Sequence, residues 1–375
     1  MKPSLLSLLR CPDCGSTLRL RVLEQQARRS GLIQSEGRFR ATYCAHCDSG
    51  ECEDCAKVDI REGSLACSSC HALNPIINSV PRFLPDTPDM FPEFWRKWGS
   101  KLSDTSSGIE PYQLKTGLDS EYRQVVRHFQ TQWQYWGKHS KNFGRDIQQS
   151  LEFLQWTLAP KDAGPLFFDR KLILDAGCGH GKYLAALSAK NVEVIGMDIT
   201  LSIDLCQELV GDRNNVHLVQ GDVIHPPFAK GMFDYVYSNG VIHHTPDTRR
   251  AFRSLAALPK TSAIYAVWVY PYRAKWWDFT QKAIRSVTTR LPPELLRVLC
   301  YLPVPLLSIP GIGAYSDTSL ETSSWAECAQ VIFDFYGPKY QTHHTPEEVE
   351  QWFKEEGYAA IAFGPDPLSV IGVRI

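Results

Sequence analysis

The chain has 375 residues, of which 43% are hydrophobic and 22% charged, as in an ordinary soluble globular protein that is long enough for two domains. Its 40 Lys and Arg nearly balance its 41 Asp and Glu, so no overall charge attracts nucleic acid or an anionic membrane, although this leaves room for a local basic patch. No apolar run reaches about 18 residues, and the short leucine run before Cys11 lacks the features of a secretory signal. We therefore expect a cytoplasmic protein without a transmembrane helix.

Eight of the twelve cysteines lie in the first 70 residues and form four C-x2-C pairs: Cys11/Cys14, Cys44/Cys47, Cys52/Cys55 and Cys67/Cys70. Disulfides do not require this spacing, whereas tetrahedral thiolate sites use it repeatedly, so the pattern predicts zinc in a reducing compartment. Eight thiolates suit two ions, but the spacing alone leaves the pairing of the motifs open, and His46 and His71 are weaker candidate ligands. Because an all-thiolate site has no open position for a substrate, we expect the zinc to be structural, with one or two ions.

Residues 86–170 are rich in aromatic side chains and follow a proline-punctuated exit from the cysteine-rich segment, residues 1–85. The stretch from Glu121 to Trp136 is expected to form a helix. The simpler interpretation of these rings is packing within a helical linker and cap. The alternative is that some of them line a substrate cleft.

From Lys171 onward, apolar strand-like segments alternate with helical segments, which is typical of an α/β fold with a parallel sheet and helices on both faces. Thr345 is expected to cap a helix that begins at Pro346. Residues 271–325 interrupt the alternation and are predicted to be an inserted lid, with plain packing as the alternative. Strands are expected near 172–175, 192–197, 216–220, 233–238, 263–269, 359–363 and 368–374, and helices near 182–190, 202–210 and 247–258.

The strand that ends at Asp175 runs into a turn with glycine at every second position, Gly177, Gly179 and Gly181. Glycine permits positive φ and lets the backbone approach a ligand where a Cβ would clash. The next two strands end at Asp198 and Asp222. A carboxylate at the first position can accept hydrogen bonds from ribose hydroxyls, and one at the second could meet an adenine amino group. The spacing of the turn and the two acids therefore predicts a nucleoside-binding site.

With these motifs, residues 171–270 resemble class I S-adenosylmethionine-dependent methyltransferases. The resemblance implies a Rossmann-like sheet and a domain spanning residues 171–375. It also implies that Asp198 binds the ribose, that Asn239 lies where the fourth strand meets cofactor and substrate, and that two further groups of residues contact the cofactor. These are Asp175, Gly177, Gly179 and Gly181 around the methionine part, and Asp222 and Val223 in the adenine pocket. One departure is the segment 258–262, where the family usually has a Pro-Gly-Gly turn.

Two adjacent histidines, His243 and His244, follow the fourth strand at the expected mouth of the site. The sulfonium is already a strong electrophile, so the protein has to position the acceptor and, for a hydroxyl or amine, remove a proton. Histidine titrates near neutral pH and suits that role. The alternative is that the pair caps a helix or packs against the cofactor. A second pair, His343 and His344, is a weaker candidate for the base.

The first and last cysteine motifs, with the segment that ends in Val80-Pro81-Arg82-Phe83, resemble the small zinc-ribbon protein that activates several methyltransferases. This resemblance implies a small β-rich ribbon that packs on the methyltransferase domain within one chain. On this resemblance one ion is shared by Cys11, Cys14, Cys67 and Cys70, and a second by Cys44, Cys47, Cys52 and Cys55. Consecutive pairing of the motifs is the rival arrangement.

The sequence thus predicts a methyltransferase that uses S-adenosylmethionine and acts on a small molecule, most simply on a hydroxyl of a secondary or surface metabolite. A tRNA or other nucleic-acid methyltransferase is the alternative, which the balanced charge disfavours. A third hypothesis, from another class, is a non-catalytic zinc-ribbon scaffold that only binds the cofactor; the histidine pair argues against it.

Overall fold

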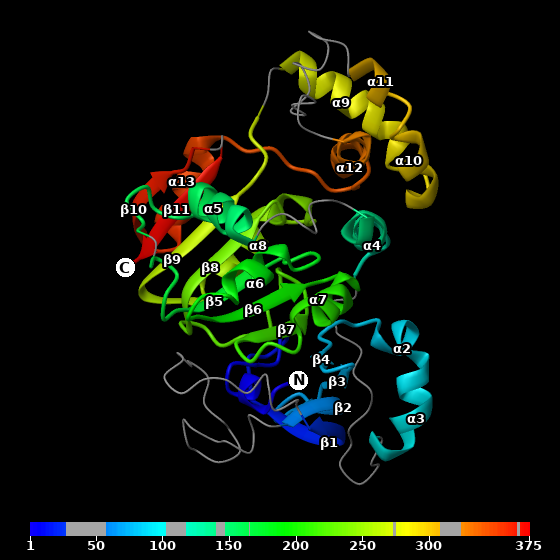
Figure 1. Cartoon of the computed structure of the whole chain (residues 1–375), viewed down its shortest axis with the longest axis vertical. Coiled ribbons are helices and arrows are strands. Elements are labelled where there is room, and N and C mark those ends of the chain that lie inside the picture. The colour runs from blue at the N-terminus through cyan, green and yellow to red at the C-terminus, as the bar shows by residue number, and fades with distance from the viewer. Residues whose placement is uncertain are drawn as a thin grey trace.

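The computed structural model describes residues 1–27, 58–102, 118–139, 147–164, 166–272, 275–307, 324–365 and 368–375. Within them lie a four-stranded sheet of order β1-β2-β3-β4 and a seven-stranded sheet of order β10-β11-β9-β8-β5-β6-β7. Figure 1 shows the small sheet below the large one and a group of helices at the opposite end. None of the helices in the described parts is both long and apolar enough to cross a membrane.

The large sheet has five parallel strands and an antiparallel edge. Every residue of β5, β6 and β7 is buried, as expected when helices cover both faces of a parallel sheet. The predicted α/β architecture is therefore confirmed. The strands are β5 (Leu172–Ala176), β6 (Glu193–Asp198), β7 (Val216–Gln220), β8 (Phe233–Asn239), β9 (Pro259–Trp268), β10 (Tyr358–Phe363) and β11 (Ser369–Arg374).

Alternate residues of the central strands belong to two separate cores, one on each face of the sheet. Leu172 and Leu174 of β5 pack with the face that carries α8 (Thr248–Ala256) and α13 (Pro346–Glu355). Ile173, between them, packs with the face that carries α5 (Ile147–Leu158), α6 (Lys182–Leu187) and α7 (Ser202–Val210).

The two helices on the first face have N-caps that the sequence encodes. Thr345 caps α13 as predicted, because its Oγ1 accepts from the backbone N–H of Glu348 at 3.2 Å. Asp247 caps α8 in the same way, accepting from Arg250 N at 2.9 Å.

Strand β9 begins earlier than the sequence suggests, at Pro259 instead of near Ala263. The pairing of β8 with β9 shifts between Phe233 and Tyr235, and Ser262 adopts a positive φ of 63°. Arg374 steadies this turn by donating to the Ala257 carbonyl at 2.9 Å. The segment that departs from the Pro-Gly-Gly pattern thus forms an irregular start of the strand.

A group of cap helices stands over the carboxyl ends of the strands: α4 (Ser120–His139), α9 (Lys275–Thr288), α10 (Pro293–Leu299), α11 (Val304–Leu307) and α12 (Trp325–Tyr336). In Figure 1, α9 to α12 gather at one end of the molecule, joined to the sheet by the segments after β9 and before α13. Helices α10, α11 and α12 share a small core with α4, made of Trp136, Leu296, Cys300, Val304, Cys328, Ala329 and Phe333.

The N-terminal unit consists of η1 (Pro3–Ser7), β1 (Leu18–Ala27), β2 (Val58–Cys67), β3 (Leu73–Ile77) and β4 (Val80–Pro81), followed by α2 (Thr87–Met90) and α3 (Pro92–Leu102). Helix α3 packs Phe94 and Leu102 on Leu73 of the small sheet. Directly after β4, Arg82 pairs in parallel with Gln220 at the end of β7. The small sheet therefore docks at the β7 edge of the large one.

Buried polar contacts hold this junction together. The Arg82 side chain is fully buried, and its guanidinium donates to Asp204 Oδ1 of α7 at 2.5 Å and to Gln220 Oε1 at 3.1 Å. Phe83 N donates to the Gln220 carbonyl at 2.8 Å. Burial lowers the pKa of the Arg82 guanidinium, and the charge of Asp204 opposes that shift.

Candidate functional site

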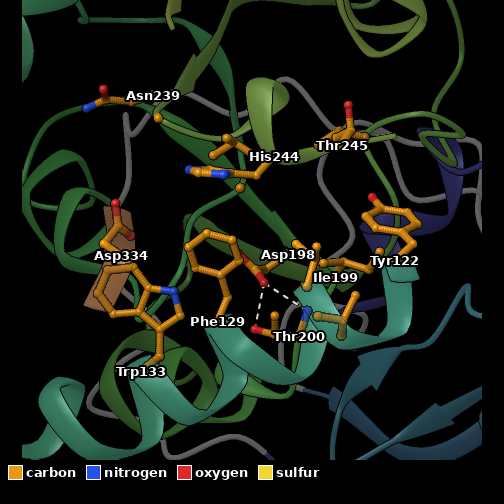
Figure 2. A pocket seen from close by; sticks show the side chains of 16 residues that line it. Tyr122, Phe129, Trp133, Asp198, Ile199, Thr200, Asn239, His244, Thr245 and Asp334 are labelled. Atoms are coloured by element: carbon orange, nitrogen blue, oxygen red, sulfur yellow. Dashed lines mark hydrogen bonds between the residues drawn. The ribbon is translucent and has the colours of Figure 1, made fainter. Parts of the chain in front are cut away.

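A cleft of about 690 Å³, partly open to solvent, lies where the parallel strands end beneath the cap helices. This is where ligands bind in open α/β sheets. Figure 2 shows the side chains of α4 facing those from the strand ends. The lining residues are Tyr122, Val125, Val126, Phe129, Trp133, Gly177, Asp198, Ile199, Thr200, Val223, Asn239, Gly240, Val241, His244, Thr245 and Asp334.

The predicted cofactor residues gather at or directly beside this cleft. Gly177, Asp198, Val223 and Asn239 line it. The other four, Asp175, Gly179, Gly181 and Asp222, belong to the same strand ends and turns.

The glycine turn after β5 leaves no room for side chains. Gly177 has a φ of 94°, and a Cβ there would lie 2.3 Å from Cγ2 of Val241. A Cβ at Gly179, whose φ is 55°, would lie 3.0 Å from the Trp133 ring. Both positions therefore require glycine on conformational and steric grounds.

Asp198, at the end of β6, holds the glycine turn and its own loop together. Its Oδ2 accepts from Gly179 N at 2.8 Å, and its Oδ1 accepts from Thr200 N at 2.8 Å and Thr200 Oγ1 at 2.7 Å. The contacts with Thr200 are drawn in Figure 2. Burial raises the pKa of the Asp198 carboxyl, and these hydrogen bonds oppose the rise.

Asp222, expected at the adenine end, faces α4. Its Oδ1 accepts from the Tyr122 hydroxyl at 2.9 Å and from Ile224 N at 2.9 Å. Three aromatic residues of α4, Tyr122, Phe129 and Trp133, line the cleft, whereas Trp136 of the same helix is in the cap core. The aromatic segment thus takes part in both packing and the cleft.

The two adjacent histidines have different surroundings. His244 lines the cleft, and its Nδ1 lies 3.0 Å from the Tyr340 carbonyl oxygen, to which it can only donate. His243 is fully buried, is absent from the lining, and packs on Tyr270 with ring centroids 4.0 Å apart. Burial lowers the pKa of both imidazoles.

The second histidine pair lies outside the cleft lining. His344 contacts Glu348 through Nδ1 at 3.1 Å and Thr342 Oγ1 through Nε2 at 2.9 Å, beside the N-terminus of α13. His343 packs near Tyr270, with ring centroids 6.0 Å apart.

Sequence reasoning missed Asp334 of α12, an acid in the cleft. Its Oδ1 accepts from Gln132 Nε2 at 3.0 Å and its Oδ2 from the Tyr270 hydroxyl at 2.8 Å. Its charge opposes the lowering of the His244 pKa. The available signal was a single carboxylate within the otherwise apolar and aromatic run from Ile332 to Tyr336.

Four of the predicted zinc ligands come together at one end of the small sheet. The Sγ atoms of Cys11, Cys14, Cys67 and Cys70 all lie within 4.8 Å of one another. The individual separations of 3.4, 3.6 and 3.7 Å are close to the ~3.8 Å between sulfurs that zinc–sulfur bonds of about 2.3 Å produce in a tetrahedron. The residues present therefore fit a zinc ion. Cys44, Cys47, Cys52 and Cys55, and also His46, lie outside the described residues.

The thiols of this cluster are not equivalent. Cys14 is exposed, and hydrogen bonds from Ser16 lower the pKa of its thiol to about 6. Cys11 is buried, which raises the pKa of its thiol. His71 is exposed and does not belong to the cluster.

Comparison with known proteins finds a family that is similar to the central part of the large sheet. Residues 174–267 match the family described as a methyltransferase domain. The malonyl-[acyl-carrier protein] O-methyltransferase of Legionella pneumophila is 34% identical over 122 residues, which are 32% of this chain and 38% of that protein. The tRNA (carboxymethyluridine(34)-5-O)-methyltransferase of Xenopus tropicalis is 34% identical over 88 residues, 23% of this chain and 13% of that protein.

Among solved structures, a methyltransferase of Thermotoga maritima described as dependent on S-adenosylmethionine aligns with 66% of this chain and 99% of its own, at 11% identity and a TM-score of 0.40. The chain spans less than two fifths of the length of the two curated relatives it matches. Residues 174–267 therefore match a methyltransferase domain, and the two relatives are named for acceptors of different chemical classes.

Proposed function

We propose that this protein transfers a methyl group from S-adenosylmethionine to a hydroxyl of a small-molecule acceptor, with His244 as the general base. The observation that carries the proposal is the orientation of His244, whose Nδ1 is engaged with the Tyr340 carbonyl while the residue lines the cleft. The other nitrogen, Nε2, keeps a lone pair.

In this proposal the cofactor lies across the strand ends. The glycine turn at Gly177 and Gly179 takes the methionine part, Asp198 accepts hydrogen bonds from the ribose hydroxyls, and Val223 contacts the adenine beside Asp222. Asn239 at the end of β8 faces both cofactor and acceptor. The absence of side chains at the two glycines supports close backbone approach there.

When bound, the cofactor supplies an electrophilic methyl group on a sulfonium. The protein then has three tasks: to hold the acceptor oxygen in line, to exclude water and to take the proton. Phe129 and Trp133 of α4 are apolar walls that limit water. His244 Nε2 would take the hydroxyl proton while the methyl–oxygen bond forms and the methyl–sulfur bond breaks, which leaves a neutral thioether. The ring then becomes an imidazolium whose charge Asp334 stabilises.

The charge of the cleft indicates which acceptors fit. Among the described residues that line it, the ionisable groups are Asp198, Asp334, His244 and Tyr122, and these described residues include no Lys or Arg. A phosphate-rich acceptor requires cationic partners, so this lining favours a neutral, partly apolar molecule over nucleic acid. A non-catalytic scaffold would have no need of a histidine held with a free basic nitrogen.

We further propose that Cys11, Cys14, Cys67 and Cys70 hold one structural zinc ion, which fixes the turn before β1 to the turn after β2. An ion bound by four thiolates has no open position, so it takes no part in methyl transfer.

Calorimetry with S-adenosylmethionine and S-adenosylhomocysteine tests the cofactor site directly. A methylation screen of metabolite pools with a labelled methyl donor then identifies the acceptor. Filter binding to tRNA over a salt series tests the alternative that the acceptor is a nucleic acid, because binding that falls steeply with salt would support that alternative. If neither the sulfonium nor its demethylated product binds the zinc-loaded protein, the proposed activity is wrong.

A further inference from the structure

Two cap helices expose an unusual amount of apolar surface. Between residues 275 and 302 lie seven of the fifteen large hydrophobic side chains that are exposed in the described parts of the chain. We call this set the apolar cap face. It consists of Phe279, Ile284, Val287, Leu295, Val298, Leu299 and Leu302. Phe279 and Leu302 are the most open, at 74% and 73% exposure.

Helix α9 has its polar side inward, the reverse of an ordinary surface helix. Gln281 is 3% exposed and donates to the Tyr336 hydroxyl at 2.9 Å. Arg285 donates to the Phe335 and Pro338 carbonyls, both at 2.6 Å, and Thr288 donates to the Tyr336 carbonyl at 2.7 Å. These contacts fix α9 to the C-terminal end of α12, so its apolar side faces away from the protein.

Helix α10 also exposes apolar side chains, although its inward side is apolar as well. It buries Leu296 and Cys300 in the cap core. Leu295, Val298, Leu299 and Leu302 are exposed and follow the spacing of three and four residues that places side chains on one side of a helix. The exposed residues thus form a stripe along α10 that continues to Leu302, just after the helix ends at Leu299.

The same segment is basic in a chain that is nearly neutral. Residues 275–302 contain five Lys or Arg and two Asp or Glu, against a net charge of −1 for the whole chain. One of the five, Arg285, is turned inward to the Phe335 and Pro338 carbonyls, so four basic residues remain against two acidic ones. Lys282 and Arg290 are exposed. Helices that combine an apolar side with basic residues lie in the interface of membranes that contain anionic lipid, where burial of apolar groups and attraction to the headgroups add together.

We propose that the apolar cap face docks on an anionic lipid surface, with α9 and α10 lying in the headgroup region. Helix α12, on which both helices pack, carries Asp334 into the cleft, so docking would bring the cleft mouth close to molecules that reside in the membrane. This last link rests on the proposed methyl transfer, whereas the docking itself does not.

Co-sedimentation of the full-length, zinc-loaded protein with vesicles tests the docking. Vesicles of phosphatidylcholine with phosphatidylglycerol are expected to bind it, and vesicles of phosphatidylcholine alone much less. The double variant Phe279→Ser with Val287→Ser should lose at least about tenfold in affinity, because two apolar side chains no longer leave water. Lys282→Glu with Arg290→Glu should reduce binding to the level of the neutral vesicles.

Leu166→Ser is the matched control, since Leu166 is 73% exposed and precedes the amino end of the central strand β5, whereas the cap helices stand over the carboxyl ends of the strands. It should bind vesicles like the wild type, and all variants should keep the wild-type melting temperature because the substituted side chains are exposed.

The proposal is overturned if the wild type stays in the supernatant, or if the serine variants bind as it does. It is also overturned if light scattering without lipid shows a dimer that the Phe279 and Val287 substitutions dissociate, since the face would then join two copies of the chain. Vesicle binding is read without cofactor, so its failure is distinct from a failure of methyl transfer.

Discussion

His244 donates its Nδ1–H to the carbonyl oxygen of Tyr340 across 3.0 Å, and this contact decides the tautomer of the ring. A carbonyl oxygen only accepts, so in the neutral imidazole Nε2 keeps its lone pair. His243, the adjacent residue, has no hydrogen-bond partner for either ring nitrogen among the described residues and packs against Tyr270. Two neighbouring histidines therefore differ in chemistry and can be separated by substitution.

We predict that His244→Ala lowers kcat by roughly 100-fold or more, because the acceptor proton then has no positioned base. Its affinity for S-adenosylmethionine in calorimetry should stay close to that of the wild type. His243→Ala should instead lower the free energy of unfolding by about 2–5 kcal/mol through the cavity it leaves, with turnover per folded molecule little changed. Full turnover of the His244 variant on the true acceptor would contradict the assignment.

Substitution of Asp198 should act on cofactor affinity. In Asp198→Ala the proposed acceptor for the ribose is lost, and Gly179 N and Thr200 lose their acceptor as well. Calorimetry should therefore show the Kd for S-adenosylhomocysteine raised by at least about tenfold. Asp234→Asn is the matched control. It changes an acid at the amino end of β8, whereas the cleft lies at the carboxyl ends of the strands. Its carboxylate accepts from Leu172 N at 2.8 Å. Equal losses in the two variants would mean that the effect is general to the sheet.

The buried carboxyl of Asp175 should make the free energy of unfolding depend on pH. Burial raises the pKa of its carboxyl from 3.8 to about 7, and the Tyr237 hydroxyl opposes the rise. Because the folded protein keeps this proton to higher pH than the unfolded chain, stability should fall as pH rises from about 4 to 7 and level off above. Asp175→Asn should remove that slope. Urea unfolding of both proteins at pH 5 and pH 8 measures it, and a difference between the two proteins that does not change with pH would argue against the buried acid.

The glycine turn and its acids could be predicted because they are local. Each follows an apolar strand, and the carboxyl ends of parallel strands meet at one edge. The distinction between His243 and His244 could not be predicted, because it depends on the Tyr340 carbonyl, which is far away in sequence. Asp334 was missed for the same reason, since Gln132 of α4 and Tyr270 after β9 hold it at the cleft.

The cysteine pairing shows a similar limit. Spacing alone allows either arrangement of the motifs, and the hairpin decides for the described cysteines. Leu18 at the start of β1 pairs with Cys67 at the end of β2, so the turn before one strand and the turn after the other lie side by side. The antiparallel register therefore brings Cys14 to within 3.4 Å of Cys67.

Zinc content provides a direct test of this site. We predict that Cys14→Ser lowers the metal measured by atomic emission by one equivalent per chain and lowers the melting temperature, since the ion joins two turns. The double variant Cys44→Ser with Cys47→Ser is the control for pairing and should leave the ion at Cys14 in place. A triple variant that combines these substitutions should lose the sum of the two separate losses. A triple variant that loses only the one equivalent that each variant loses by itself would favour the consecutive pairing instead.

The junction between the two sheets should depend on Arg82. Its buried guanidinium binds Asp204 and Gln220, so Arg82→Ala leaves these partners without their donor and should lower the free energy of unfolding by about 3–5 kcal/mol in urea. Arg82→Lys should restore little of this, because one ammonium cannot replace a planar fork that reaches both groups. The matched control is Arg123→Ala, whose ion pair with Asp86 is at the surface, with the Arg123 side chain 54% exposed, and is expected to be worth about 0–1 kcal/mol.

The Arg82 variants should also bind cofactor more weakly, because Gln220 leads directly to Asp222 and Val223, where we propose that the adenine binds, and Phe83 N holds the Gln220 carbonyl. Calorimetry on folded Arg82→Lys separates this effect from global unfolding. Unfolding of Arg82→Ala at the same urea concentration as Arg123→Ala would show that apolar packing at the β7 edge, and not the buried guanidinium, joins the N-terminal sheet to the methyltransferase domain.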